Sequence, residues 1–138
     1  MDVDDESRWS GSDVSWLAVD GDGRVGWFTT NGSGLVPREL ANDSDLIGQE
    51  EIFAEWLRNQ GRAFRFGHGD EQWLDATSVG VNSYDYSSAS DCFERKADAI
   101  VLLLATDLPA PVRHQIERVV RPDIHFKDMP SIPSHSMV

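Results

Sequence analysis

Two short segments rich in β-branched and aromatic residues lie on either side of Gly21-Asp22-Gly23. The first covers residues 15–20 and the second covers residues 24–29. Glycine and aspartate between two such segments are typical of a tight turn, because they accept the backbone conformations that a chain reversal needs. The sequence therefore predicts a β-hairpin, which requires the fold to contain at least one antiparallel pair of strands.

A cluster of helix-capping residues at positions 42–45 is followed by apolar residues at helical spacing. Phe53 and Leu57 lie four residues apart, as do Ile52 and Trp56, so each pair shares one face of a helix. Gly61 fits the position just beyond a helix end. We therefore predict an amphipathic helix between the cap residues and Gly61. Its solvent side is predicted to carry three glutamates, Glu50, Glu51 and Glu55.

The longest apolar run covers residues 99–105, far short of the roughly 20 residues that span a bilayer. An uninterrupted run of this length is expected of a central strand buried on both faces. Residues 79–86 alternate well enough for another strand, and residues 67–76 and 87–95 are expected as loops, the first with a helical turn. Residues 112–120 fit either a helical stripe or a strand. The strand is preferred, because it would give residues 99–105 a hairpin partner.

The order of these elements predicts an α+β fold in which an antiparallel sheet of about five strands has helical cover on one face. The length of 138 residues fits one domain better than two. We expect a disordered acidic tail over residues 1–13, a single domain over residues 14–128 and a loose C-terminal tail over residues 129–138.

The chain is strongly acidic, with a formal net charge of −12. Acidic residues gather in residues 1–22 and 70–107, whereas residues 108–127 are mildly basic. A field of this sign repels nucleic acid and membrane surfaces and favours a basic protein partner. The structural alternative is that the charge only confers solubility.

The acidic N-terminus has no hydrophobic stretch behind it, so no signal peptide is predicted. Cys92 is the one cysteine, and an intrachain disulfide therefore cannot form. These features lead us to expect a soluble protein of the reducing cytoplasm.

Tests for catalytic and cofactor motifs find none. The segment 19–25 has the alternating carboxylates of a calcium-binding loop. If Gly23 is taken as the invariant glycine of such a loop, Thr29 falls at the position of the bidentate glutamate, so a hairpin turn is the better interpretation. The glycine-rich loop at residues 31–34 lacks the lysine of a phosphate-binding loop. The histidines and Cys92 have no zinc-ligand spacing. We therefore predict no metal, no cofactor and no catalytic residue. An enzyme of an unrecognised type is the alternative, with a site near His68, Asp70 and Asp85.

Five tryptophans are many for a chain of this length. Trp16, Trp27 and Trp56 lie within predicted elements and are expected in the core. Trp9 and Trp73 have polar surroundings, and an exposed tryptophan beside carboxylates is a candidate binding anchor. The candidate binding residues are Trp9, Trp73, Asp70, Glu71 and Asp75.

The hairpin segment also carries a resemblance. Residues 16–25 contain Trp-x-Ala-x-Asp-x-x-Gly-x-Val, and Gly34-Leu35-Val36-Pro37 follows. This pattern resembles a group of small uncharacterised bacterial proteins, which also carry an Arg-Pro segment and then Leu-Pro near the C-terminus. Residues 121–123 and 128–130 are similar to those segments, with Met129 in place of leucine. The resemblance covers about a third of the chain and brings no activity, but small acidic proteins of this style include immunity proteins that block a toxin.

Our leading hypothesis is a non-catalytic interaction module that uses acidic and aromatic surface to bind a basic partner, in the manner of an antitoxin. A homo-oligomer formed through a sheet edge is a further possibility.

Overall fold

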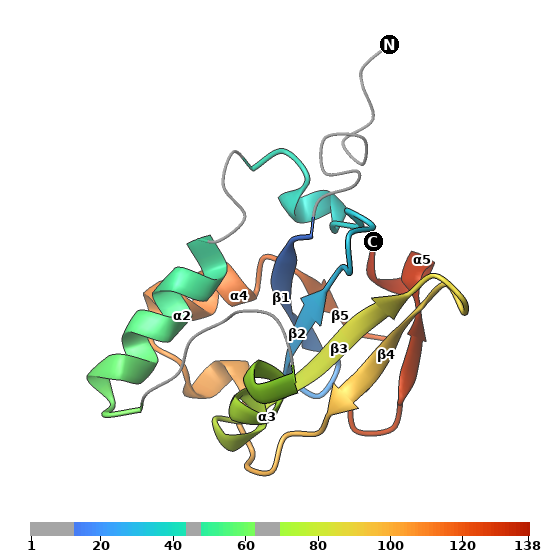
Figure 1. The fold of residues 1–138 in the computed structure, drawn as a ribbon. Helices are drawn as coiled ribbons and strands as arrows, with labels where there is room; N and C mark the ends of the chain where they lie inside the picture. Colours follow the sequence, from blue (N-terminus) through green and yellow to red (C-terminus); the bar gives the residue numbers. More distant parts are fainter. Residues whose placement is uncertain (1–12, 44–47, 63–69) are drawn as a thin grey trace.

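The fold is built on one six-stranded sheet. A computed structural model describes residues 13–43, 48–62 and 70–138, without the side chains of Asp70, Glu71 and Leu74. The strand order is β5-β1-β2-β3-β4-β6. The strands are β1 (Ser15–Asp20), β2 (Val25–Thr29), β3 (Val81–Ser87), β4 (Cys92–Ala97), β5 (Val120–Arg121) and β6 (Ser131–Pro133). The curled shape of this sheet is visible in Figure 1.

The sheet is mixed, so the predicted α+β class holds but the predicted antiparallel sheet of about five strands is wrong. Strands joined by short turns pair antiparallel, as in β1–β2 and β3–β4. The long connection from β2 to β3 instead brings these strands together in parallel, and β5 also lies parallel to β1. Parallel neighbours require such crossover connections, which local sequence patterns do not reveal.

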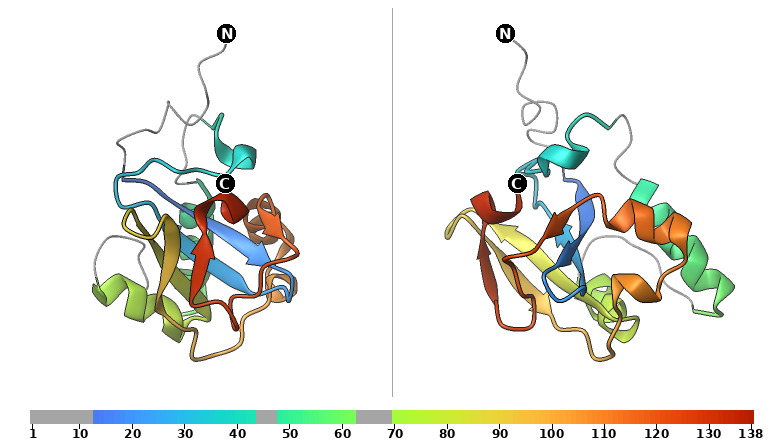
Figure 2. Two further views of the ribbon diagram at one scale, coloured as in Figure 1. Left: turned by 90° about the vertical axis from the view of Figure 1, so that its right-hand side faces the viewer. Right: turned by 180° about the vertical axis from the view of Figure 1, so that it is seen from behind.

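Three helices cover one face of the sheet: α2 (Gly48–Asn59), α3 (Asp70–Ser78) and α4 (Ala110–Ile116). Figures 1 and 2 show α2 and α4 side by side. Phe53 and Leu57 of α2 are fully buried against Leu17, Trp27 and other apolar residues of this face. The predicted amphipathic helix is confirmed over residues 48–59. Gly61 follows it with a φ of +77°, and the N–H of Arg62 returns to the carbonyl of Leu57.

An aromatic core fills the opposite face. Trp16, Phe28 and Tyr84 are neighbours across β1, β2 and β3, and their rings stack with centroid separations of 4.6 Å and 5.0 Å. Phe93 meets Phe28 edge-on at 5.3 Å. The 3-10 helix η1 (Arg38–Leu40) and the chain beyond β5 cover these rings. This arrangement confirms that Trp16 and Trp27 are core residues, one on each face.

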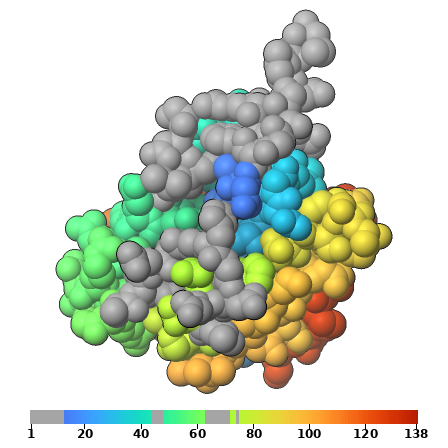
Figure 3. Space-filling view, viewed as in Figure 1, coloured from blue at the N-terminus to red at the C-terminus, as the bar shows by residue number. Residues whose placement is uncertain are grey.

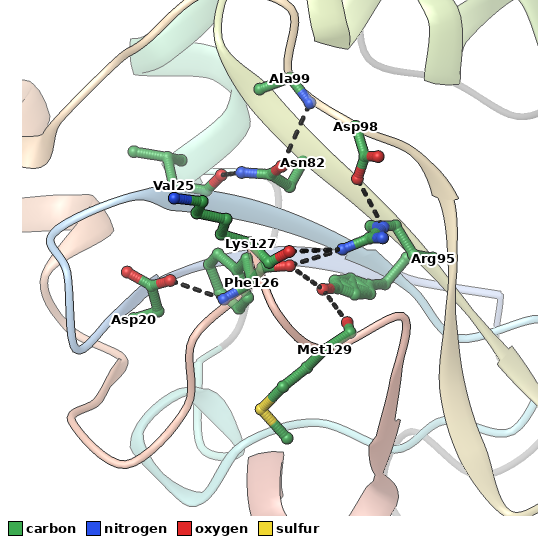
Figure 4. Close-up of polar contacts among 10 residues, drawn as sticks. Asp20, Val25, Asn82, Arg95, Asp98, Ala99, Phe126, Lys127 and Met129 are labelled. Carbon is green, nitrogen blue, oxygen red and sulfur yellow. Dashed lines mark hydrogen bonds and ion pairs between the residues drawn. The ribbon is translucent and has the colours of Figure 1, made fainter.

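The C-terminal segment belongs to the fold, and the predicted loose tail over residues 129–138 is wrong. It forms β6 and the short helix α5 (Ser134–Met137), and Ile132 and Met137 are fully buried. The hydroxyl of Tyr84 donates to the carbonyls of Phe126 and Met129, while Arg95 donates to Phe126 (Figure 4). The proline and serine content of this segment is typical of a flexible tail. Composition does not reveal the hydrogen bonds to Tyr84 and Arg95, which lie far away in the sequence. The predicted N-terminal tail lies outside the described residues except for Asp13, which is exposed.

The predicted hairpin is confirmed. The buried carboxylate of Asp20 organises its turn by accepting the N–H groups of Asp22 and Arg24 at 3.0 and 2.9 Å. Its other oxygen accepts the N–H of Phe126 at 2.7 Å. Asp20 therefore joins the turn to the C-terminal segment by backbone hydrogen bonds.

Several element predictions need correction. Residues 92–95, expected in a loop, belong to β4, while residues 112–120 contain the end of α4 and the first residue of β5 in place of one strand. Helix α3 covers much of the segment 67–76, where only a helical turn was expected. Glu50 of α2 is buried, contrary to the prediction, whereas Glu51 and Glu55 are exposed as predicted.

The apolar run at residues 99–105 is not a central strand. It is an irregular connection between β4 and the 3-10 helix η2 (Ala105–Asp107), and of its residues only Leu103 and Ala105 are buried. Both sides of β2 and β3 are already paired within the sheet, so no central position is left for this segment.

Candidate interaction surface

The connection after β4 exposes three consecutive large apolar side chains. Ile100 is 74% exposed, Val101 45% and Leu102 62%. Among the described residues, Val120 is the one other large apolar residue that is exposed. Such side chains in a contiguous group are unusual on a protein surface that has no partner. We call residues 100–102 the apolar loop; it lies beyond β4, along the lower edge of the molecule in Figure 1 and Figure 3.

Hydrogen bonds at both ends hold the apolar loop in place. The N–H of Ala99 donates to the side chain of Asn82, which in turn donates to the carbonyl of Val25 (Figure 4). The N–H of Ile100 donates to the carbonyl of Thr77 at the end of α3, at 3.1 Å. Beyond the loop, the N–H of Ala105 donates to the carbonyl of Gly23 at 2.8 Å. A segment held in this way loses little conformational entropy when a partner binds to it.

A groove of about 550 Å³ opens beside the apolar loop. It is lined by residues at or just beyond α2 and α3, by the connection after β4 and by η2; these residues are Trp56, Arg62, Ser78, Val79, Val101, Leu102, Leu103 and Asp107. Gly80 makes this wall possible, because its φ is +97° and an added Cβ would lie 2.4 Å from the Cβ of Leu103. The close approach lets Leu103 enter the core while Leu102 faces the groove.

The charges around the groove are unevenly distributed. No lysine or arginine occurs in residues 97–112, which contain Asp98 and Asp107. Asp107 is exposed, and its carboxylate accepts the backbone N–H of Leu104 at 3.0 Å. Asp98 is paired with Arg95, whereas the part of the chain that the structure describes provides no ion pair for Asp107. The groove lining also contains one cation, Arg62, which follows α2.

Of the predicted binding residues, Asp75 contacts a residue of the groove wall through its backbone. It is exposed on α3, and its carbonyl accepts the hydroxyl of Ser78, a residue that lines the groove. Asp70 and Glu71 form the start of α3, but their side chains are outside the described part of the structure, as is all of Trp9.

Trp73 is turned toward the interior. It is half-buried against the core beneath the helices, as is Trp56, and the ammonium group of Lys96 lies 5.9 Å from the centroid of its ring. Its indole N–H is buried, and no described residue accepts a hydrogen bond from it.

Of the residues of the alternative enzyme site, Asp85 is the one whose side chain the structure describes, because the side chain of Asp70 lies outside the described part. The carboxylate of Asp85 accepts the hydroxyl of Thr29 at 2.6 Å, and these residues are register partners in β3 and β2. His68 lies outside the described residues. Glu50 is a buried carboxylate of α2; it accepts the indole N–H of Trp27 at 3.1 Å and the hydroxyl of Ser15. These bonds fasten α2 to the hairpin.

Shifted pKa values occur away from the groove. The Asp22 carboxylate accepts a hydrogen bond from His125 at 3.0 Å and raises the pKa of this exposed histidine. Burial raises the pKa of Tyr84 to about 12, consistent with its role as a hydrogen-bond donor in the aromatic core. Hydrogen bonds from Tyr86 and Ser134 lower the pKa of Asp91, which faces α5.

Cys92 is partly exposed and contacts the carbonyl of Ser90. Within residues 13–43, 48–62 and 70–138, no group of three or more histidine, cysteine, aspartate or glutamate side chains is arranged to hold a metal ion. No helix in these same ranges combines the length and apolar character needed to cross a membrane.

Comparisons with protein-family models, with curated proteins and with solved structures found no match to this chain.

Proposed function

We propose that this protein is a non-catalytic interaction module that binds a basic protein partner. The exposed apolar loop is the observation that carries the proposal. Burying apolar surface is the main favourable contribution to most protein association, and the anchored backbone presents Ile100 and Leu102 to a partner at little entropic cost.

The charge of the chain supports a basic partner. A net charge of −12 attracts cationic proteins over long distances and speeds their association. Residues 70–94 contain six acidic residues and no lysine or arginine, and this stretch includes α3 beside the groove. The resemblance to small bacterial proteins favours one form of the proposal, an antitoxin-like inhibitor in the cytoplasm. No observation in the described residues favours the alternative enzyme site.

The proposal is tested by affinity capture from a lysate of the native host at low salt, elution with salt and identification by mass spectrometry. The dissociation constant of the main captured protein is then measured from about 0.1 M to about 1 M salt, over which the Debye length falls from roughly 10 Å to roughly 3 Å. We expect a basic protein whose affinity weakens steeply with salt. A partner that is not basic, or an affinity that does not change with salt, would contradict the proposal.

A further inference from the structure

The groove beside the apolar loop has a lining of both apolar and polar residues and a size suited to a short segment of a partner. Trp56, Val79 and Leu103 line it, and Val101 and Leu102 extend this surface onto the exposed loop. Its volume of about 550 Å³ falls within the range of roughly 300–1,000 Å³ that is usual for sites holding small ligands. It is therefore large enough for one or a few side chains, but not for a whole domain face.

An apolar side chain of a partner could enter the groove. The side of the groove formed by η2 and the end of α3 favours a cationic residue next to that side chain. Asp107 lines the groove, is exposed and has no ion-pair partner among the described residues. Asp75 is exposed one helical turn before Ser78, another residue of the groove wall. The carboxylate of Asp107 therefore lines the groove, and the cation Arg62, just beyond α2, lines it as well.

A second copy of this chain is a poor occupant. Two molecules that each carry a charge of −12 repel one another, and their approach would bring like-charged carboxylates together. The sheet edges are also short, since β5 has two residues and β6 has three and ends in Pro133.

We propose that this groove binds a partner segment in which a large apolar side chain is flanked by lysine or arginine. The apolar side chain packs against Trp56, Val79 and Leu102, and the cation pairs with Asp107. This inference rests on the proposed function, because it specifies the partner chemistry at the same surface.

The experiment uses the full chain labelled with ¹⁵N and three synthetic peptides of equal length. The first contains leucine and lysine, the second replaces leucine with serine, and the third replaces lysine with glutamate. We expect the leucine–lysine peptide to shift the amide signals of Leu102, Leu103 and Asp107 and the indole signal of Trp56. The other two peptides should bind much more weakly.

Variants of the protein assign the contributions. Leu102→Ser should weaken binding of the leucine–lysine peptide about tenfold, as expected for one buried leucine. Asp107→Asn should reduce the salt dependence of binding, while its amide oxygen can still accept the N–H of Leu104. Val120→Ser is the matched control, because Val120 is also an exposed apolar residue but lies on β5, and it should bind as the unmodified chain does.

The contrary outcomes separate this inference from the proposed function. If the leucine–lysine peptide does not bind, or shifts signals elsewhere and ignores Leu102→Ser, the assigned site is wrong. If the glutamate peptide binds equally well, the cationic requirement is wrong. A dimer that Leu102→Ser abolishes would show that a second copy occupies the groove. A basic partner captured with steep salt dependence would still support the proposed function in each of these cases.

Discussion

Individual polar groups in the core differ in whether they have hydrogen-bond partners. The hydroxyl of Thr29 donates to Asp85 at 2.6 Å, whereas the hydroxyl of Ser83 on the neighbouring strand is buried and has no partner among the described residues. A buried hydroxyl without a partner has lost its hydration without compensation. Thr29 and Ser83 therefore form a matched pair for measuring how much a buried hydroxyl contributes to the free energy of unfolding.

We predict that Ser83→Ala leaves the free energy of unfolding unchanged or raises it by up to about 1 kcal/mol. Thr29→Val should lower it by about 1–3 kcal/mol, because it removes a donor from the Asp85 carboxylate. Urea denaturation of both variants measures the difference. A larger loss for Ser83→Ala than for Thr29→Val would show that this account of the two hydroxyls is incorrect.

The exposed His125–Asp22 pair provides a pH-dependent contact at the hairpin turn. Asp22 raises the pKa of His125 above its usual value of about 6.5, so the contact stabilises the folded chain below that pH. This contribution is lost as the pH rises through the folded-state pKa. Asp22→Asn should return the pKa of His125 toward the usual value, which an NMR titration of the imidazole signals would detect. An unchanged pKa would assign the shift to another group.

Among the elements, the C-terminal segment makes the clearest contribution to stability. Ile132 of β6 is fully buried in the aromatic core, next to Phe93 in the strand register. We predict that Ile132→Ala lowers the free energy of unfolding by about 2–5 kcal/mol. The exposed neighbour Ser131 is the control, and Ser131→Ala should change it by less than about 0.5 kcal/mol. If chemical denaturation shows that both variants leave the free energy of unfolding nearly unchanged, the segment is a loose tail.

The apolar run contains a second matched pair. Leu103 is buried and Leu102 is exposed, although both are leucines and they are adjacent in the sequence. Leu103→Ala should lower the free energy of unfolding by about 2–5 kcal/mol, whereas Leu102→Ala should change it by less than about 0.5 kcal/mol. Similar large losses for both variants would indicate a strand buried on both faces.

These elements also show how far the sequence predicts the fold. The hairpin and α2 are predicted correctly, because their turn residues and apolar spacing act within a few residues. The pairing of β2 with β3 is not predicted, because it joins segments more than fifty residues apart whose pairing no local pattern specifies. Residues 99–105 are misassigned for a related reason, since composition does not state whether an apolar side chain meets the core or a surface.

The candidate site is predicted only in outline. The acidic stretch that contains Asp75 is evident from the sequence, and the structure places this residue near the groove. Trp73 was a candidate anchor because of its polar neighbours, but helical geometry turns it against the core. The sequence does not predict the apolar loop, and its one signal there is that no lysine or arginine occurs between Asp98 and Asp107.

At the scale of the whole molecule, the proposed interaction combines a long-range acidic field with an apolar contact surface. In the proposed interaction, the field would bring a basic partner to the protein, and burial of the apolar loop would provide much of the binding free energy. These contributions are separable, because salt screens the field but leaves the exposed side chains unchanged.

The most direct test is the affinity of the captured basic partner for the variant Ile100→Ser/Leu102→Ser, measured at fixed salt concentration. Because both side chains are exposed, the variant should unfold at nearly the same denaturant concentration as the unmodified chain. We predict that its affinity falls at least about tenfold, as expected when apolar side chains are lost from an interface. An equally stable variant that binds the partner with unchanged affinity would contradict the central claim that the apolar loop is the binding surface.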